Sequence, residues 1–275
     1  MLTAYDYPTA RAASTNGIDV TLVGDSLAQV CLGYSSTTSL TLDEMLHHCR
    51  AVARGTTAPF LVADMPFGSY YAGQEDTIRA AVRMLQEGNV EAVKLEGGSE
   101  IAERVKALTS IGIPVMAHVG LLPQRHTALS GYRVQGRTVD SARSILHSAL
   151  ALQEAGAFSI VLEAIPASLA AYITSRLKVP TIGIGAGPGC SGQVLVWDDV
   201  MGTWSGHKAK FVRRFGDVKN EVERGVKAYA NAVRDGSFPH REREGYTMDE
   251  GEIEKLLERE SDQEWSWSPP KPSST

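Results

Sequence analysis

Cysteines and long apolar runs are scarce in this chain. Its 275 residues include three cysteines, Cys31, Cys49 and Cys190. Their number is odd, and their spacing fits neither a zinc site nor a disulfide framework, so a reducing compartment is favoured. No run approaches the ~20 consecutive apolar residues that a membrane-spanning helix needs. These absences argue against a disulfide-stabilised secreted domain, a zinc protein and a membrane protein.

The chain also lacks an excess of positive charge. It carries 27 Lys and Arg against 32 Asp and Glu, a formal net charge of −5. A nucleic-acid-binding protein normally shows a basic excess, so no nucleic-acid partner is expected. The first residues, MLTAYDYPTA, have neither the charged start of a signal peptide nor a transit-peptide composition. We expect a cytoplasmic protein, or a mitochondrial one if a targeting segment has been lost from the N-terminus.

What the chain does contain is a series of short apolar runs that each end at a polar or glycine residue. Such runs, rich in Val, Ile and Leu, are typical of strands buried on both faces of a parallel sheet. Six of them cover residues 20–26, 60–66, 92–98, 114–120, 160–166 and 181–187. Residues 1–5 and 193–197 are expected to form the first and eighth strands.

Helical segments separate these runs. We expect helices at 41–54, 75–87, 100–110, 139–155 and 167–177. Thr41 and Glu44 form a capping-box pattern, and Gly88 and Gly156 mark helix ends. Polar residues end nearly every strand, which favours a (β/α)8 TIM barrel over an open sheet with one switch point. The joint before the eighth strand is too short for a normal crossover helix, so a truncated helix or one helical turn is expected there.

The composition changes toward the C-terminus. We expect a catalytic barrel domain over residues 1–238 and a charged, partly disordered extension over 239–275. Helices are expected at 217–234, an outer amphipathic helix, and at 249–260. Trp265 and Trp267 lie in a Ser- and Pro-rich end, where they either contact a partner or belong to an irregular tail.

Two aspartates end neighbouring strands. Asp25 follows the second strand and Asp64 ends the third. Neighbouring strands lie about 4.8 Å apart, so the two carboxylates repel each other unless they are protonated or bridged by a cation. Oxygen ligands without Cys or His favour Mg2+ over zinc. The alternative is that each aspartate only caps the following helix.

The fourth strand carries an ammonium and a carboxylate on one face. Lys94 and Glu96 are two residues apart, which turns both into the barrel and leaves Val93 and Leu95 facing the helices. Buried charges need a partner or a metal ion. Either the two form a salt bridge, or Lys94 binds an anionic substrate while Glu96 serves the metal.

Two further polar residues end the next strands. His118 ends the fifth strand and is either a structural histidine or part of the same rim. Glu163 ends an apolar run on the sixth strand, the setting of a general base that works near neutral pH, unless it forms a rim salt bridge. A magnesium site beside a carboxylate base suits deprotonation of a carbon next to a carbonyl.

The glycine-rich stretch 183–187 suggests a nucleotide-binding loop only weakly. No helix-forming run and no acidic residue for a ribose follow it in a βαβ unit. We interpret it as backbone that turns tightly or passes close to the substrate.

Several motifs in a fixed order are more specific than these single residues. They are MLTAYDYPTA, LVGDSL, LVADMPFGSY, VKLEGG, GYRVQGR, VLEAIP, IGIGAG and GQVLVWDD. By these motifs the chain resembles the ketopantoate hydroxymethyltransferase family from its start to about residue 238. The resemblance implies a barrel related to the phosphoenolpyruvate mutase and isocitrate lyase superfamily. It also implies a role in pantothenate biosynthesis, with transfer of a hydroxymethyl group from 5,10-methylenetetrahydrofolate to 3-methyl-2-oxobutanoate.

The resemblance also implies roles for the rim residues. Asp25 and Asp64 would bind Mg2+, and Glu96 would complete the metal environment through water. Glu163 matches the base that abstracts the substrate proton. The contacts to the keto acid would come from Asp25, Ser26, Asp64, Lys94 and His118. The partners implied are small molecules and further copies of the chain, since family members are homo-oligomers, often decamers.

One departure and two rival functions stay open. Family members usually carry a helix before MLTAYD that closes the barrel bottom and contributes to assembly, and that helix is missing here. The rivals are a Mg-dependent lyase or mutase that acts on carbon–carbon bonds of 2-oxo acids, and a catalytically inactive barrel subunit. GYRVQGR favours the transferase, and the intact rim residues argue against an inactive barrel.

Overall fold

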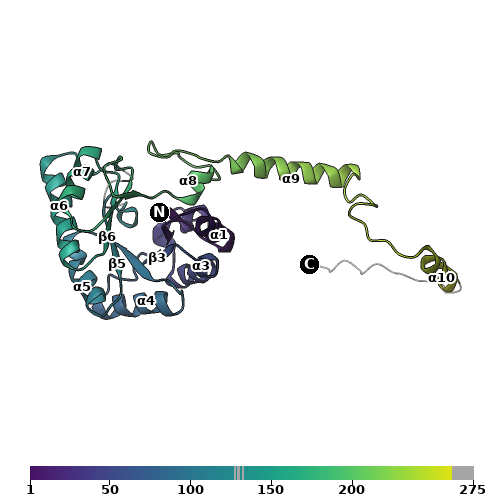
Figure 1. Cartoon of the computed structure of the whole chain (residues 1–275), viewed down its shortest axis with the longest axis horizontal. Helices are drawn as coiled ribbons and strands as arrows, with labels where there is room; N and C mark the ends of the chain where they lie inside the picture. Colours follow the sequence, from purple (N-terminus) through teal and green to yellow (C-terminus); the bar gives the residue numbers. More distant parts are fainter. Residues whose placement is uncertain (127, 129–130, 132, 262–275) are drawn as a thin grey trace, which may run out of the picture. The chain divides into compact units, whose positions relative to one another are not determined.

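Eight parallel strands in sequence order form the centre of the molecule (Figure 1). The computed structural model describes residues 1–126, 128, 131 and 133–261. It divides into two units, Met1–Lys219 and Asn220–Thr275. The strands are β1 (Leu2–Thr3), β2 (Val20–Val23), β3 (Phe60–Asp64), β4 (Ala92–Glu96), β5 (Val115–Gly120), β6 (Ser159–Glu163), β7 (Thr181–Ile184) and β8 (Gly192–Gln193).

The sheet closes on itself at the seam between its first and last strands. Leu2 forms a parallel bridge with Leu195, and the N-terminal amine donates to the carbonyl of Gln193 at 3.1 Å. Inside the seam the Trp197 N–H donates to Thr3 Oγ1 at 2.7 Å, and Thr3 donates to the Tyr5 hydroxyl at 2.8 Å. The expected (β/α)8 barrel is therefore confirmed.

Helices surround the strands (Figure 1). Those of the first unit are α1 (Tyr7–Thr15), α2 (Leu27–Val30), α3 (Leu42–Gly55), α4 (Gln74–Gln86), α5 (Ala102–Ser110), α6 (Val139–Glu154), α7 (Ala167–Arg176) and α8 (Trp197–Met201). Short 3-10 turns occur at Thr37–Ser39, Ser99–Ile101 and Pro123–Arg125. The capping box of α3 is present, since Glu44 N–H donates to Thr41 Oγ1 and Thr41 N–H donates to the Glu44 carboxylate. This pairing satisfies two N–H groups that a helix start otherwise leaves open.

Strand residues alternate between two apolar cores. Side chains that face outward, such as Val93 and Leu95, pack in a large cluster with the helices. Side chains that face inward fill the barrel with a smaller cluster formed by Leu22, Val62, Ala92, Met116 and Val161. Leu22 and Val161 of this inner cluster line the same cavity as the polar residues at the strand ends.

Two expectations about the end of the barrel are wrong. The eighth strand was expected at 193–197, but β8 is Gly192–Gln193, and Trp197 begins helix α8. The joint between β7 and β8 contains no helix, only a turn and bends. Gly185 and Gly187 adopt left-handed φ values of 64° and 74°, and side chains there would collide with Phe211 and Ala167. The glycine-rich stretch therefore turns tightly, as its composition suggested.

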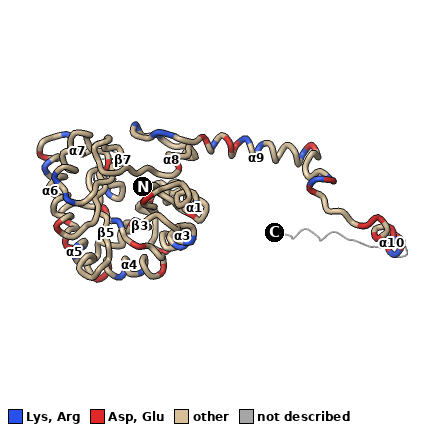
Figure 2. The backbone as a smooth tube through the Cα atoms, viewed as in Figure 1, with Lys and Arg blue, Asp and Glu red and all other residues tan. Residues whose placement is uncertain are grey.

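The second unit contains two helices, α9 (Val218–Asp235), which begins just before the unit boundary, and α10 (Glu250–Glu260). Both lie close to their expected positions, both carry mixed charges (Figure 2), and none of their residues is buried. The division into domains at residue 238 stays a prediction. Trp265 and Trp267 lie outside the described residues. Within the described residues, no helix is both long and apolar enough to pass through a bilayer.

The seam generates a stability prediction. Replacing Thr3 by Val keeps the side-chain shape but leaves the Trp197 N–H without its buried acceptor. We expect the free energy of unfolding to fall by about 1–3 kcal/mol, the cost of an unsatisfied buried donor. Urea titration of Thr3→Val measures this change. The control is Thr57→Val, because the Thr57 side chain is exposed and makes no hydrogen bond to any residue that the structure describes; equal losses in both variants would contradict the role given to Thr3.

Candidate active site

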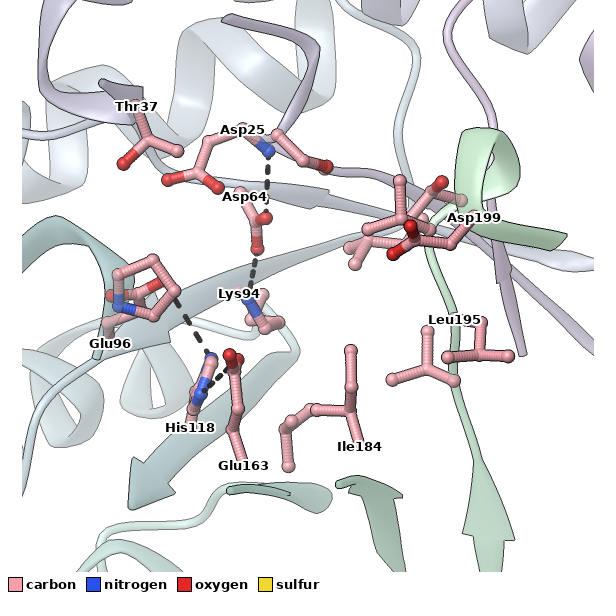
Figure 3. A pocket seen from close by; sticks show the side chains of 18 of the residues that line it. Asp25, Thr37, Asp64, Lys94, Glu96, His118, Glu163, Ile184, Leu195 and Asp199 are labelled. Atoms are coloured by element: carbon pink, nitrogen blue, oxygen red, sulfur yellow. Dashed lines mark hydrogen bonds and ion pairs between the residues drawn. The ribbon is translucent and has the colours of Figure 1, made fainter. Parts of the chain in front are cut away.

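Polar side chains from β2 through β6 converge on one cavity at the C-terminal ends of the strands (Figure 3). The cavity has a volume of about 180 Å³. Its floor is apolar and includes Leu22, Val161 and Ile184. All seven residues expected at the site line it: Asp25, Ser26, Asp64, Lys94, Glu96, His118 and Glu163.

Strand register places the fourth-strand lysine beside the third-strand aspartate. Asp64 pairs with Lys94 in the parallel ladder between β3 and β4. Lys94 Nζ donates to Asp64 Oδ1 at 2.5 Å, and both side chains are 5% exposed. Lys94 therefore pairs with Asp64, and the salt bridge with Glu96 that was left open as an alternative does not form.

Asp25 contacts the same pair from the β2 side. Its backbone N–H donates to Asp64 Oδ2 at 3.0 Å, so both oxygens of Asp64 accept a hydrogen bond. The Asp25 carboxylate accepts from Gln124 Nε2 at 2.9 Å. The N-cap alternative for Asp25 fails, because the N-cap residue of α2 is Ser26 and makes no side-chain capping bond.

The other half of the cavity contains a histidine between two glutamates. Glu96 pairs with His118 and Gly120 pairs with Glu163 in neighbouring ladders. His118 Nε2 lies 3.2 Å from Glu163 Oε2, and Nδ1 lies 3.8 Å from Glu96 Oε1. Neither ring nitrogen makes a hydrogen bond of good geometry within the described residues, although the ring is buried. The imidazole is thus available to a bound molecule.

The backbone beside Glu163 is tightly constrained. A side chain at Gly120, whose φ is 99°, would overlap the Glu163 carbonyl. Ala164 adopts a left-handed φ of 48°, which is rare for a residue with a Cβ. Its carbonyl accepts from the N–H of Gln135, a residue of the GYRVQGR motif. Tyr132 of that motif lies outside the described residues.

Electrostatics of the cavity are dominated by crowded carboxylates. Burial and the charge of Asp64 raise the pKa of Asp25 to about 7. Burial and the charge of Asp25 likewise raise the pKa of Glu96 well above its ordinary value. Lys94 is the only ammonium that lines the cavity among the described residues. Three buried carboxylates against one cation leave excess negative charge, which a bound cation relieves.

The donor set suits a hard cation. Asp25, Asp64 and Glu96 offer only oxygen, the ligand type that Mg2+ prefers. Within the described ranges, no three His, Cys, Asp or Glu side chains are already gathered tightly enough to hold a metal ion. The oxygen donors of the three residues nevertheless match magnesium in chemistry and charge.

A larger chamber of about 810 Å³ adjoins the cavity. The two share Ser26, Gln29, Glu163, Val196, Asp199 and Phe211 as lining residues. Its other walls combine the aromatic ring of Trp204 with the basic side chains of Arg133, His207 and Lys210.

Among the lining residues that the sequence interpretation missed are Gln29, Asp199, Arg133 and Phe211. It also missed Gln124, which bonds to Asp25 from behind the cavity wall. Gln124 and Arg133 follow the β5 strand end, and Asp199 follows the β8 strand end, which is the barrel face where chemistry is expected. Their position after a strand was a usable signal for three of the five.

Comparison with known proteins identifies the family. The family model described as "Ketopantoate hydroxymethyltransferase" matches residues 1–241. The chain belongs to this family. It is 53% identical over 239 residues to a 3-methyl-2-oxobutanoate hydroxymethyltransferase of Heliobacterium modesticaldum, covering 87% of both chains. A protein of the same name from Acetivibrio thermocellus is 48% identical over 256 residues, covering 93% of this chain and 90% of its own.

Solved structures of distantly similar sequence share this fold. A phosphonopyruvate hydrolase crystallised with oxalate and Mg++ superimposes with a TM-score of 0.58 at 16% identity, covering 94% of this chain and 90% of its own. A phosphoenolpyruvate phosphomutase from Streptomyces platensis gives a TM-score of 0.57 at 15% identity, covering 94% and 92%. The fold of this ketopantoate hydroxymethyltransferase family member is therefore that of the phosphoenolpyruvate mutase group.

The raised pKa of Asp25 generates a pH prediction. The folded metal-free protein keeps this proton up to about pH 7, whereas the unfolded chain releases it near its ordinary pKa of 3.8. The folded state then binds more protons between these values, so the contribution of Asp25 to stability falls as pH rises from about 4 to about 7. Urea unfolding in EDTA across this range should give a steeper decline for the parent protein than for Asp25→Asn. Parallel declines would contradict the assignment.

Proposed function

We propose that this chain catalyses hydroxymethyl transfer from 5,10-methylenetetrahydrofolate to 3-methyl-2-oxobutanoate, in pantothenate biosynthesis. The observation that carries the proposal is the convergence of the Lys94–Asp64 pair, Asp25 and Glu96 with Glu163 around one cavity. Family membership supports the same activity.

The keto acid fits the inner cavity by charge and shape. Its carboxylate and 2-oxo group are acceptors, and Lys94 and the Ser26 hydroxyl are donors on the cavity wall. Tyr5 and Ser26 hydroxyls lie 2.8 Å apart, which fixes Ser26 against the barrel seam. The branched alkyl end of the substrate matches the apolar floor.

Asp25 and Asp64 would hold Mg2+, with Glu96 acting through water. When bound, the ion supplies Lewis-acid polarisation of the 2-oxo group, which acidifies the neighbouring C–H. Asp25 and Asp64 belong to both the metal and the substrate environment in this proposal, because both line the cavity and lie next to each other (Figure 3).

Glu163 is the base in this proposal. Its carboxylate takes the C3 proton of the keto acid, and the enolate forms a carbon–carbon bond with the one-carbon unit of the folate. Both carbon–nitrogen bonds of the methylene unit break, to N10 and to N5, and water supplies the hydroxyl oxygen. The two nitrogens take up the proton from C3 and one proton from water, leaving tetrahydrofolate. His118, 3.2 Å from Glu163, is placed to donate to or accept from the new hydroxyl group.

The outer chamber would bind the folate. It opens on Glu163, so a one-carbon donor there faces the deprotonated carbon. Trp204 and Phe211 offer flat apolar surface for the aromatic rings of a folate. Arg133 and Lys210 form no ion pair within the described residues and can meet the carboxylates of its glutamate tail. Homo-oligomeric assembly and a cytoplasmic location stay predictions.

Removal of the base tests the chemistry. Glu163→Gln should reduce exchange of the C3 proton into D2O by at least about 100-fold, the usual effect of losing a general base. The keto acid should still bind, because Lys94 and Ser26 are unchanged. Proton NMR measures the exchange and calorimetry measures binding. Glu154→Gln, an exposed glutamate at the end of α6, is the control; exchange retained in Glu163→Gln removes Glu163 from the base role.

A second variant tests the folate chamber. Arg133→Gln should raise KM for 5,10-methylenetetrahydrofolate by about tenfold, since a charge-assisted contact is lost, and leave C3 exchange unchanged. Steady-state kinetics with each substrate varied in turn separates the two effects. Arg176→Gln, an exposed arginine in the last turn of α7, is the matched control. An unchanged KM for the folate would place its tail elsewhere.

A further inference from the structure

Gln124 is a buried polar residue that the proposed chemistry does not use. It lies in the 3-10 turn Pro123–Arg125 that follows β5, and it is 3% exposed. Its neighbour Pro123 lines the cavity, whereas Gln124 lies behind the wall. A buried amide has four hydrogen-bonding positions to satisfy, so its partners show what it does.

All of its side-chain bonds are directed at the site or at residues that support it. Nε2 donates to Asp25 Oδ2 at 2.9 Å and to the Met65 carbonyl at 3.0 Å. Oε1 accepts from the Tyr70 hydroxyl at 2.6 Å, and Tyr71 donates to it more weakly at 3.5 Å. Both N–H groups of the amide therefore donate a hydrogen bond, and one of them donates to Asp25, a proposed magnesium ligand.

The backbone of the same residue reaches a second carboxylate. The Gln124 N–H donates to Glu96 Oε2 at 3.0 Å. Asp25 follows β2 and Glu96 ends β4, and Gln124 bonds to both. One residue thus fixes one oxygen on each of two acidic side chains.

The amide has a single acceptable orientation. Rotation by 180° would turn Oε1 toward the Asp25 carboxylate and the Met65 carbonyl, which are both acceptors. In the observed orientation the Tyr70 hydroxyl donates to Gln124 Oε1 at 2.6 Å, and the Glu96 carbonyl lies 3.2 Å from the same hydroxyl. Between buried groups, an acceptor facing an acceptor is costly.

We propose that Gln124 is a positioning residue that decides which oxygens of Asp25 and Glu96 face the cavity, and so sets its affinity for a divalent cation. Because Asp25 Oδ2 and Glu96 Oε2 are engaged by N–H groups, Oδ1 and Oε1 are left for the ion or its water ligands. The two N–H bonds also offset the repulsion between the carboxylates. Tyr70 holds the amide in place from the opposite side. The inference rests on the proposed function only for the nature of the ion.

Mn2+ binding to the full-length protein without substrate tests this role, because it requires no turnover. Mn2+ replaces Mg2+ at oxygen sites, and electron paramagnetic resonance counts the free ion. Gln124→Met keeps the side-chain length and removes the amide, and should weaken Mn2+ binding about 10- to 100-fold, the usual cost of losing an outer partner of a ligand. Gln124→Glu should weaken binding through misplacement of Asp25, although it adds a negative charge to the site.

Comparison of Tyr70→Phe with Tyr71→Phe distinguishes the orienting of the Gln124 amide from a general loosening of the packing around it. Tyr70→Phe removes the short bond that orients the amide and should weaken Mn2+ binding about fivefold, as expected for one neutral hydrogen bond. Tyr71→Phe removes the long contact to Oε1 and the 3.2 Å bond to the Tyr70 hydroxyl, but it keeps the short Tyr70–Gln124 bond, so binding should stay unchanged. In the double variant Gln124→Met with Tyr70→Phe, the second change should add no further loss, because its effect passes through Gln124.

The outcomes are distinct. A folded Gln124→Met variant that binds Mn2+ as tightly as the parent protein overturns the inference and leaves the proposed function intact. If Gln124→Met fails to fold, Tyr70→Phe decides alone, and parent-like binding in that variant overturns the inference. A parent protein that binds no Mn2+ would overturn the inference together with the magnesium site of the proposed function.

Discussion

The buried ion pair between Lys94 and Asp64 is the interaction on which the site depends. An aspartate and a lysine inside an apolar barrel are costly to bury, and they persist because each satisfies the other at 2.5 Å. The pair also fixes Asp64 so that its second oxygen accepts from the Asp25 backbone. The result is an acidic site whose charge is only partly balanced, which is the condition for binding a cation and an anionic keto acid together.

Parallel register explains how residues far apart in the sequence meet. Neighbouring strands align their inward-facing side chains in register, so Asp64 lies beside Lys94 and Glu96 beside His118. The apolar side chains of Leu22, Val161 and Ile184 line the same cavity. Fold and site therefore follow from one rule, in which the strand ends carry polar residues and the strand centres carry apolar ones.

That rule made much of the molecule predictable from the sequence. Alternation placed Lys94 and Glu96 inward and Val93 and Leu95 outward, and both placements are confirmed. The end of the barrel was harder to predict, because β8 is only two residues long and closes through a bridge at Leu195 that no local pattern marks.

The partners within the site were also less predictable than its members. Gln124 bonds to Asp25 across 99 positions of the chain, and a lone glutamine in a loop carries no sign of this. The choice of Asp64 over Glu96 as the partner of Lys94 depends on register and side-chain direction, and both became evident only in three dimensions.

Hydrogen bonds run in series from Trp197 through Thr3 and Tyr5 to Ser26, and they connect the barrel seam to the active site. The first strand and the segment after the last strand are joined by the same hydroxyl groups that hold a proposed substrate contact. Opening of the seam would therefore disorder Ser26 before the rest of the barrel melts. Loss of keto acid affinity on heating would then precede loss of helix content, and bound keto acid would hold together the two ends of the sheet.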